Sequence, residues 1–403
     1  MLFVAEIQSW SKMSITQIGQ IKQLIEQGEN SAVEFKSSEV RPESLAREIV
    51  AFANSSGGTI LIGVEDSGKI TGVDHHQTET WVANIVRNNV IPAIAPQITE
   101  WELSQKKVLA IEVSRGLDKP YQTLDGKFWI RVGSTNRMAT KEELSRLFQQ
   151  AGLVHFDIAP LEQTSMIDLD DRKLHEYWFT YYSINYLELE QEEQKRLLRN
   201  ADILGLLEGE ETVTVGGMLL FGKDPQRRIP QSFITFAVFD GLLLTDELLD
   251  KQNIGGTLPE LIQQTHAKAR IFVPKPSTLS GMQRVEVPMI PDKVIREALV
   301  NAVFHRDYSI SNRRMAVYVF RDRLEISSPG RLPNTLNLEK ILTGNSAPRN
   351  QFLLKYLDNM KYIDGLGRGV PMIARETKGN FLYSEEGEIL RLVLPFQAPV
   401  PTG

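Results

Sequence analysis

The chain has 403 residues, of which 42% are hydrophobic, 24% charged and 8% aromatic, a globular composition with room for two or three domains. It contains no cysteine, which excludes disulfide scaffolds, thiolate metal sites and cysteine nucleophiles. The formal net charge of −6 indicates that any nucleic-acid contact comes from a local patch, because dedicated nucleic-acid coat proteins are usually basic. No apolar run approaches the roughly 20 residues that span a bilayer. The first residues also lack a signal-peptide pattern, so we expect a cytoplasmic location.

The first third of the chain predicts a mixed α/β domain over residues 28–152, after an N-terminal helical segment at 1–27. Helical periodicity over ESLAREIVAFANSS ends at the pair Gly57-Gly58, and the β-branched run TILIGVED after it predicts a buried strand. Two more helices are predicted over TWVANIVRNNVIP and KEELSRLFQQAG, and two more strands over KKVLAIEVSR and KFWIRVG.

Acidic side chains stand near the predicted strands of this domain. Glu29 and Glu34 flank a short segment, and Asp66 follows the TILIGVED strand. With Lys36 two residues after Glu34, the pattern is similar to that of metal-dependent nucleases, in which carboxylates hold a divalent ion and a lysine polarises phosphate or water. The alternative is that Glu34 and Lys36 form a salt bridge on one face of an exposed strand.

Three separated motifs, GENSAVEFKSS, LAREIVAFANSSGGTILIGVEDSGKITGV and FWIRVGSTNRMATKEEL, resemble the Schlafen AlbA-type domain from about residue 28 to 150. The resemblance implies a nucleic-acid-binding domain, with DNA expected rather than RNA. Some relatives cleave RNA with three carboxylates, which would fall here on Glu29, Glu34 and Asp66. Because cleaving members combine two such modules and this chain shows one, a nuclease would require a dimer.

Contacts to nucleic acid are expected from four cations: Lys36, Arg131, Arg137 and Lys141. Trp129 lies on the KFWIRVG strand beside Arg131. The segment GSTNRMAT is expected to be a loop whose amides, hydroxyls and arginine suit phosphate contacts. The alternative is a solvated loop with a stray arginine.

Residues 153–290 predict a linker and a middle α/β segment that packs on the C-terminal domain. The helix KLHEYWFTYYSINYL favours core packing of its aromatic side chains over a base-stacking platform, because they lie on all faces with few basic neighbours. The run from Gly217 to Asp224 partly fits a phosphate-binding loop, but its large apolar residues predict a buried strand. His305-Arg306-Asp307 imitates a kinase catalytic loop without its companion motifs, so a kinase is excluded.

The helix PDKVIREALVNAVFHRDYS carries a polar stripe on an apolar surface. Glu297, Asn301 and His305 recur every four residues and therefore share a face. Burying three polar side chains without partners is costly, and a ligand with phosphates and a metal ion would satisfy them. The alternative is an amphipathic helix with a narrow solvated stripe.

The elements after this helix predict the remaining walls of a ligand site. MAVYVFRDRLEISSPGRL predicts a hairpin that ends in a tight loop, and LTGNSAPRNQFL predicts a polar loop that could act as a lid. Gly365, Gly367 and Gly369 stand before a predicted helix, so free amides at its N-terminus suit phosphate.

This order resembles the GHKL ATP-binding fold over residues 291–403, in the branch labelled after the RecG C-terminus; no helicase motor motif is present, so a helicase is not implied. The resemblance implies ATP and Mg²⁺ as cofactors. Asn301 would coordinate Mg²⁺, Glu297 would orient or deprotonate water, and the three glycines would face the phosphates. The family has a loop with an aspartate that reads the adenine amine. Here residues 327–331 take the place of that loop, without the aspartate, and Ser328 and Gly330 are the expected ligand contacts. Adenine selectivity and hydrolysis are therefore left open.

We therefore expect an α/β protein with an N-terminal Schlafen AlbA-type domain and a C-terminal GHKL-like sandwich. The expected function is a nucleotide-responsive, DNA-binding transcriptional regulator of bacterial type that forms a homodimer. A metal-dependent nuclease with a GHKL-like regulatory domain is the alternative, and a scaffold with two relic sites is the third hypothesis.

Overall fold

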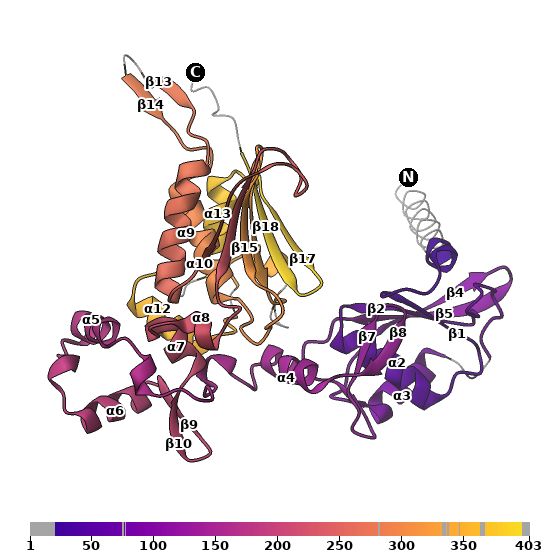
Figure 1. Cartoon of the computed structure of the whole chain (residues 1–403). Coiled ribbons are helices and arrows are strands. Elements are labelled where there is room, and N and C mark those ends of the chain that lie inside the picture. Colours follow the sequence, from indigo (N-terminus) through magenta and orange to yellow (C-terminus); the bar gives the residue numbers. More distant parts are fainter. Residues whose placement is uncertain are drawn as a thin grey trace, which may run out of the picture. The chain divides into compact units, whose positions relative to one another are not determined.

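The computed structural model of the chain divides into two compact units, Met1–Val154 and His155–Gly403 (Figure 1). It describes residues 21–74, 76, 78–280, 283–332, 336, 338–345, 347–362 and 367–396. Within these residues, no helix is both long and apolar enough to cross a membrane. Each unit is built around a sheet of its own and is described by itself.

The first unit contains a four-stranded sheet in which β1 and β2 are parallel and the other neighbours antiparallel. The strands in spatial order are β1 (Val33–Lys36), β2 (Gly57–Ile62), β5 (Lys106–Ser114) and β4 (Gln97–Leu103). Short antiparallel pairs are β3 (Val90–Ile91) with β6 (Gln122–Thr123), and β7 (Trp129–Val132) with β8 (Thr135–Met138). Among the described residues, this unit has the helices α2 (Pro42–Asn54), α3 (Glu79–Asn89) and α4 (Lys141–Gln150), and residues 21–27 are helical as well. Residues 1–20 of the expected N-terminal helical segment lie outside the described residues.

Helix α2 is the element that fixes the β7–β8 hairpin. It begins with Pro42, which suits the first turn, and it buries Leu45, Ile49 and Phe52 in the core. At its end, Asn54 Nδ2 donates to the carbonyls of Tyr121 (2.7 Å) and Trp129 (2.9 Å). The hairpin is thereby tied to the core of the unit.

The segment GSTNRMAT was expected to be a loop, and that expectation is wrong. Thr135–Met138 forms β8 and pairs with β7, so only Gly133 and Ser134 connect the two strands. Most residues of β8 are polar and exposed, so the sequence carries no alternating apolar pattern that would indicate a strand.

The second unit contains a six-stranded sheet in which only β11 and β15 are parallel neighbours. Its strands in spatial order are β12 (Leu248–Ile254), β11 (Ile234–Phe239), β15 (Met315–Val319), β16 (Arg323–Pro329), β18 (Ile389–Pro395) and β17 (Leu382–Glu386). Two hairpins lie outside this sheet: β9 (Leu204–Leu207) with β10 (Glu210–Val213), and β13 (Ser277–Ser280) with β14 (Gln283–Glu286).

Helices α9 (Leu258–Phe272), α10 (Asp292–Phe304) and α13 (Gly369–Glu376) lie on one face of this sheet, and α10 packs between the other two (Figure 1). The remaining helices are α5 (Asp171–Tyr182), α6 (Gln191–Asn200), α7 (Val215–Phe221), α8 (Pro225–Arg228), α11 (Leu338–Leu342) and α12 (Gln351–Asn359). Short 3₁₀ turns are η1 (Phe156–Ile158), η2 (Met166–Asp168) and η3 (Tyr186–Glu188). Strands β11 and β12 belong to the segment 153–290, so that segment supplies part of the sheet itself.

Two expectations for the middle segment need correction. The run after Gly217 was expected to be a buried strand, but it lies in helix α7, where Gly217 N donates to the capping hydroxyl of Thr214. All residues of α7 are buried, and a short run that is apolar on every side cannot be told from a strand by periodicity. In α5, Tyr177 and Trp178 are buried as expected, whereas Phe179 is 57% exposed.

Candidate functional sites

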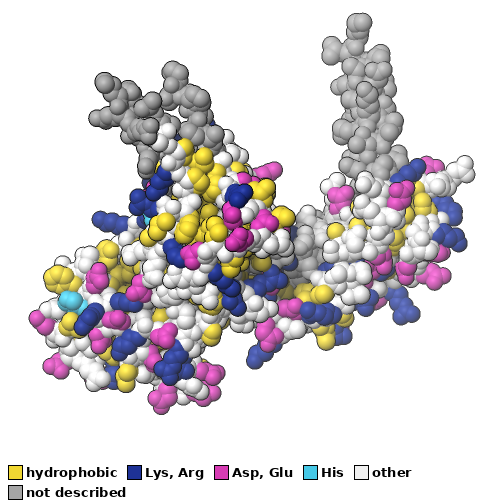
Figure 2. Space-filling model, turned by 45° about the horizontal axis from the view of Figure 1, so that its top comes forward, with side chains coloured by type: hydrophobic (Ala, Val, Ile, Leu, Met, Phe, Trp, Pro, Cys, Tyr) yellow, Lys and Arg dark blue, Asp and Glu magenta, His cyan; other side chains and the backbone are white. Residues whose placement is uncertain are grey.

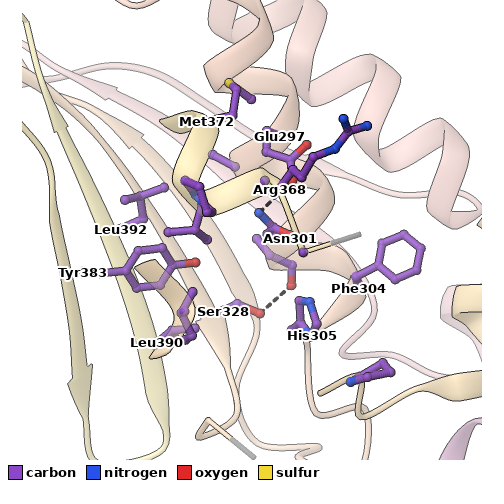
Figure 3. A pocket seen from close by; sticks show the side chains of 18 of the residues that line it. Glu297, Asn301, Phe304, His305, Ser328, Arg368, Met372, Tyr383, Leu390 and Leu392 are labelled. Atoms are coloured by element: carbon purple, nitrogen blue, oxygen red, sulfur yellow. Dashed lines mark hydrogen bonds between the residues drawn. The ribbon is translucent and has the colours of Figure 1, made fainter. Parts of the chain in front are cut away.

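A cavity of about 790 Å³ in the second unit collects the residues that sequence reasoning assigned to a ligand site (Figure 3). Its walls come from α10, the end of β16, strands β17 and β18, and the start of α13. The predicted residues that line it are Glu297, Asn301, Ser328, Gly330, Gly367 and Gly369. Gly365 lies outside the described residues.

Helix α10 presents Glu297 and Asn301 one turn apart on the wall of the cavity. The Asn301 side-chain amide donates to Glu297 Oε1 at 3.1 Å, which leaves the Asn301 carbonyl oxygen for a cation. Tyr383 points into the cavity from β17 (Figure 3). Burial and the nearby Glu297 carboxylate raise the pKa of Tyr383 to about 12, so its hydroxyl keeps its proton at neutral pH.

Gly369 begins α13 directly against this pair. A Cβ atom at Gly369 would overlap the Glu297 carboxylate and crowd the Asn301 amide. A side chain at this position would displace the Glu297 carboxylate, whereas glycine lets the N-terminus of α13 lie close to the two polar side chains. Oriented backbone amides at a helix N-terminus suit anionic groups.

His305 ends helix α10 at the edge of the cavity. Its backbone N–H donates to the Asn301 carbonyl at 3.0 Å, so it occupies the C-terminal cap of the helix. Burial, with the positive charge of Arg349 as the second cause, lowers the pKa of the His305 imidazole to about 4. The ring is therefore neutral at pH 7 and adds no charge to the cavity.

The end of β16 forms another wall. Ser328 Oγ donates to the Ala302 carbonyl at 2.6 Å, so the hydroxyl has used its proton and presents lone pairs as acceptors. Gly330 adopts a φ of 129°, which residues with a side chain rarely tolerate, and its N–H donates to the Glu388 carbonyl at 2.8 Å. A buried ion pair between Asp307 and Arg349 lies behind Gly330.

Most residues that line the cavity are apolar, and the charged ones among them are predominantly cationic. Among the described residues, one carboxylate, Glu297, faces five cations: Arg296, Arg331, Lys361, Arg368 and Arg375. A ligand with several negative charges matches this balance, because opposite charges attract strongly in a partly enclosed site.

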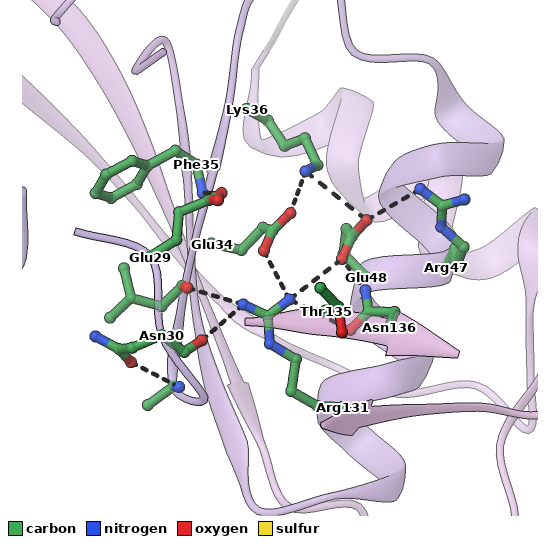
Figure 4. Close-up of polar contacts among 12 residues, drawn as sticks. Glu29, Asn30, Glu34, Phe35, Lys36, Arg47, Glu48, Arg131, Thr135 and Asn136 are labelled. Carbon is green, nitrogen blue, oxygen red and sulfur yellow. Dashed lines mark hydrogen bonds and ion pairs between the residues drawn. The ribbon is translucent and has the colours of Figure 1, made fainter. Parts of the chain in front are cut away.

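In the first unit, Glu34 and Glu48 form an ion-pair network with basic residues (Figure 4). Arg131 Nη1 lies 2.6 Å from Glu34 Oε2, and Lys36 pairs with both carboxylates. Glu48 is 2% exposed, and burial together with the charge of Glu34 raises its pKa. The alternative pairing of Glu34 with Lys36 is thus present, but Glu34 is buried rather than exposed.

The carboxylates of the nuclease hypothesis are not brought together. Within the described residues, no group of three or more His, Asp or Glu side chains could hold a metal ion. Glu29 accepts the backbone N–H of Phe35 at 2.9 Å, Glu34 is neutralised by Arg131, and Asp66 is exposed on a turn after β2. A shared hard cation requires converging oxygens, so this geometry does not support the nuclease alternative.

The four cations expected to contact nucleic acid differ in accessibility. The Arg131 side chain is 2% exposed and binds the carbonyls of Asn30 and Val33, so the prediction for this residue is wrong. The Lys36 side chain is 20% exposed and engaged with carboxylates. Arg137 is 46% exposed and paired with Glu143, and Lys141 is exposed at the start of α4, so these two remain candidates.

Sequence reasoning missed residues that reach these sites from distant elements. Tyr383 and Arg368 line the cavity but carry no motif that marks them. Glu48 stands within an amphipathic helix, where a glutamate usually indicates the solvated face. Its position directly before Ile49 and Val50 in the apolar run was the available signal, because that stretch of α2 is buried on every side.

Family comparisons match separate parts of the chain. Residues 29–140 match the family "Schlafen, AlbA_2", and residues 312–388 match "Putative ATP-dependent DNA helicase recG C-terminal". Residues 145–235 match a domain of unknown function, DUF8451. No curated protein matches the chain.

Two solved structures are similar at low sequence identity. The DIP2311 protein from Corynebacterium diphtheriae is 21% identical, over 95% of this chain and 80% of that chain, with a TM-score of 0.48. The N-terminal domain of a RecG-related protein from Nitrosomonas europaea is 22% identical, over 30% of this chain and 92% of that chain, with a TM-score of 0.24.

Residues 29–140 therefore resemble a Schlafen AlbA_2 domain and residues 312–388 a RecG C-terminal, ATPase-like domain, which confirms the predicted domain pair and the α/β class. These two matches support nucleic-acid binding and nucleotide binding. Helix α10 lies before residues 312–388, so Glu297 and Asn301 are outside the family match itself. They line the same cavity as Ser328 and Gly369, which are inside the match.

Proposed function

We propose that this chain is a nucleic-acid-binding regulator whose second unit binds ATP in the 790 Å³ cavity. The proposal rests on the way in which residues from distant parts of the sequence meet at one cavity. Side chains and glycines from α10, from the end of β16 and from the start of α13 line one cavity, although up to 72 residues separate them in sequence (297 to 369). The apolar walls suit a base, and the five cations, with one carboxylate and one carboxamide on α10, fit a triphosphate and its divalent cation.

The residues present also fit Mg²⁺, because Asn301 has a carbonyl oxygen available beside Glu297, and the glycine at 369 lets the start of α13 lie directly against this pair. Bound Mg²⁺ would neutralise phosphate charge. Asn301 would hold the ion, Arg368 and the start of α13 would contact phosphates, and Glu297 is the carboxylate that can orient water or accept its proton.

Calorimetric titration of the full chain with ATP and Mg²⁺ tests the site. We expect saturable binding that weakens at least tenfold, about 1.4 kcal/mol, in Asn301→Ala. The control is Asn200→Ala, an exposed asparagine at the end of α6 in the same unit. Absence of binding heat and of any competition with a fluorescent ATP analogue by the wild-type chain would remove the proposal.

For the first unit, we propose that exposed cations near β8 and α4 contact the nucleic-acid backbone, with DNA as the expected ligand. Arg137 and Lys141 are the accessible members of the predicted set. Fluorescence anisotropy with labelled duplex DNA and single-stranded RNA should show weaker binding for Lys141→Ala and a smaller dependence of affinity on salt, because a phosphate contact releases counterions. Unchanged affinity and salt dependence would exclude this surface.

A further inference from the structure

The turn between β11 and β12, together with the first residues of β12, exposes leucines at an outer edge of the six-stranded sheet. Leu242, Leu243, Leu244, Leu248 and Leu249 are 51%, 62%, 61%, 48% and 58% exposed. We refer to residues 240–251 as the leucine hairpin. Figure 2 shows hydrophobic side chains gathered on the surface of this unit, with charges of both signs beside them. Monomeric proteins rarely expose contiguous apolar patches of this kind, which usually mark an interaction site.

Hydrogen bonds fix the backbone of the leucine hairpin. The Asp246 carboxylate accepts the backbone N–H groups of Leu242 (2.7 Å) and Leu243 (2.8 Å). Asp240 N donates to the Glu247 carbonyl at 2.8 Å, and Arg323 Nη2 donates to the Leu242 carbonyl at 3.0 Å. The fold therefore holds these leucines outward at a fixed position, and exposure is the result of specific polar contacts.

The charges around the hairpin indicate what can cover it. Asp240, Asp246, Glu247 and Asp250 lie within twelve residues, whereas Lys251 is the only cation of the hairpin itself. Asp240 pairs with Arg321, Asp250 pairs with Lys268, and Asp246 accepts two backbone N–H groups, so the acidic side chains of the hairpin are mostly satisfied within the unit. The hairpin thus shows neither the basic patch that binds nucleic acid nor the basic residues that bind an anionic lipid surface. The leucines therefore fit an apolar protein surface.

Glu247 and Lys251 are both exposed, and neither has an ion-pair partner within the described part of the chain. They stand two residues to either side of Leu249: Lys251 lies on β12, at the edge of the sheet, and Glu247 directly precedes that strand. Leu249 is the extra residue of a β-bulge opposite Val238 and Phe239, so the edge bends there and the contact is one between side chains rather than a continued sheet. When two copies pack this patch together about a two-fold axis at Leu249, Glu247 of each copy lies on the side of Lys251 of the other. The patch is thus complementary to itself in both apolar surface and charge, as an isologous interface requires.

We propose that the leucine hairpin is the interface through which two copies of this chain associate. The contact buries the exposed leucines of both copies against one another and pairs Glu247 with Lys251 twice across the axis. This contact between copies does not depend on nucleotide binding in the cavity, because its residues belong to β11, β12 and the turn between these strands.

Analytical ultracentrifugation of the full chain over a range of concentrations tests this interface. We expect the wild-type chain to form dimers, and the double substitution Leu243→Asp and Leu244→Asp to raise the dissociation constant at least tenfold. The matched control is Leu206→Asp in the β9–β10 hairpin, which is 67% exposed and should leave the dimer unchanged. Circular dichroism verifies that each variant is folded.

A charge exchange separates this geometry from a general effect of hydrophobicity. Glu247→Lys alone should weaken the dimer, because it places like charges across the axis, and adding Lys251→Glu should restore it. A wild-type chain that stays monomeric at all concentrations would overturn the proposal. So would a dimer that is insensitive to the leucine substitutions, or a restored charge pair without restored association.

Discussion

At the scale of single residues, Arg131 shows how a cation that was expected to contact nucleic acid becomes part of the core. Its guanidinium binds Glu34, contacts Glu48 and the carbonyls of Asn30 and Val33, and is almost fully enclosed. A buried carboxylate that loses its partner is strongly destabilising. The role of Arg131 is therefore structural.

We predict that Arg131→Ala lowers the free energy of unfolding of the first unit by about 3–5 kcal/mol, because it leaves Glu34 buried without this partner. The control is Arg137→Ala, which breaks an exposed pair with Glu143 and should cost only about 0.2–1 kcal/mol. Urea denaturation followed by tryptophan fluorescence measures both. Similar small losses in the two variants would show that the buried network does not stabilise the unit.

Ser328 lies in the run 327–331, which stands where the resembled family has its adenine-reading loop, and its hydrogen bond predicts a base preference. Because its hydroxyl donates to Ala302, it can offer only an acceptor to a ligand. ATP has an amino group at the six position of the base and ITP has a carbonyl there, so ATP should bind more tightly, by about tenfold for one hydrogen bond and one avoided mismatch. Calorimetry with both nucleotides measures the ratio.

Ser328→Ala should remove this preference while leaving binding of the triphosphate moiety in place. Equal affinities of the wild-type chain for ATP and ITP would show that Ser328 does not contact the base. That outcome is distinct from a failure of the nucleotide site itself, in which neither nucleotide would bind.

At the scale of elements, the sequence predicted those whose pattern is local. Helix α10 was predicted from apolar periodicity, and Glu297 and Asn301 of its polar stripe both line the cavity. Helix α7 was mistaken for a strand, since a fully buried run has no polar face to set its period. Strand β8 was missed because its pairing with β7 is decided by the tertiary contacts of α2 and Asn54.

A substitution at the start of α13 tests whether the position of this helix matters for ATP binding. Gly369→Ala places a methyl group where the Glu297 carboxylate lies, so that carboxylate must leave its place beside Asn301 or the helix start must shift. We expect ATP binding to be lost in this variant while its thermal stability changes by only a few degrees, because the residue lies at a helix start beside a cavity. Calorimetry and thermal denaturation measure the two effects.

Gly379→Ala serves as the comparison for that substitution. Gly379 follows the same helix and has a positive φ of 78°, and an added Cβ atom would meet nothing within 4 Å, so the substitution strains the backbone without a clash at the cavity. It should lower stability by about 1 kcal/mol and keep ATP binding. Loss of binding in both variants would mean that disturbance of α13 alone, rather than the contact with Glu297, abolishes the site.

At the scale of the whole molecule, the order of the two domains was readable from motifs, whereas the extent of the second was not. The six-stranded sheet takes β11 and β12 from the segment that was expected to pack beside the domain. The pairing of β11 with β15 joins residues about 80 apart, and no local pattern specifies such a contact. The same limit applies to Tyr383, whose place in the cavity depends on the pairing of β17 with β18.

A regulator that responds to nucleotide must couple its two units, and this coupling is a property of the whole chain. If ATP changes the affinity for nucleic acid by some factor, nucleic acid must change the affinity for ATP by the same factor, because the two bindings share one thermodynamic cycle. We predict a factor of about 5–150, the usual range for coupled sites. Anisotropy gives the affinity for DNA with and without ATP and Mg²⁺, and calorimetry gives the affinity for ATP with and without DNA.

The variant that isolates this coupling is Asn301→Ala. It should bind DNA as tightly as the wild-type chain does without ATP, since its substitution lies in the cavity of the second unit, and it should show no response to added nucleotide. Equal DNA affinities with and without saturating ATP in the wild-type chain would mean that the two units bind their ligands independently. The chain would then be a protein with two separate binding activities, and nucleotide would have no regulatory part in nucleic-acid binding.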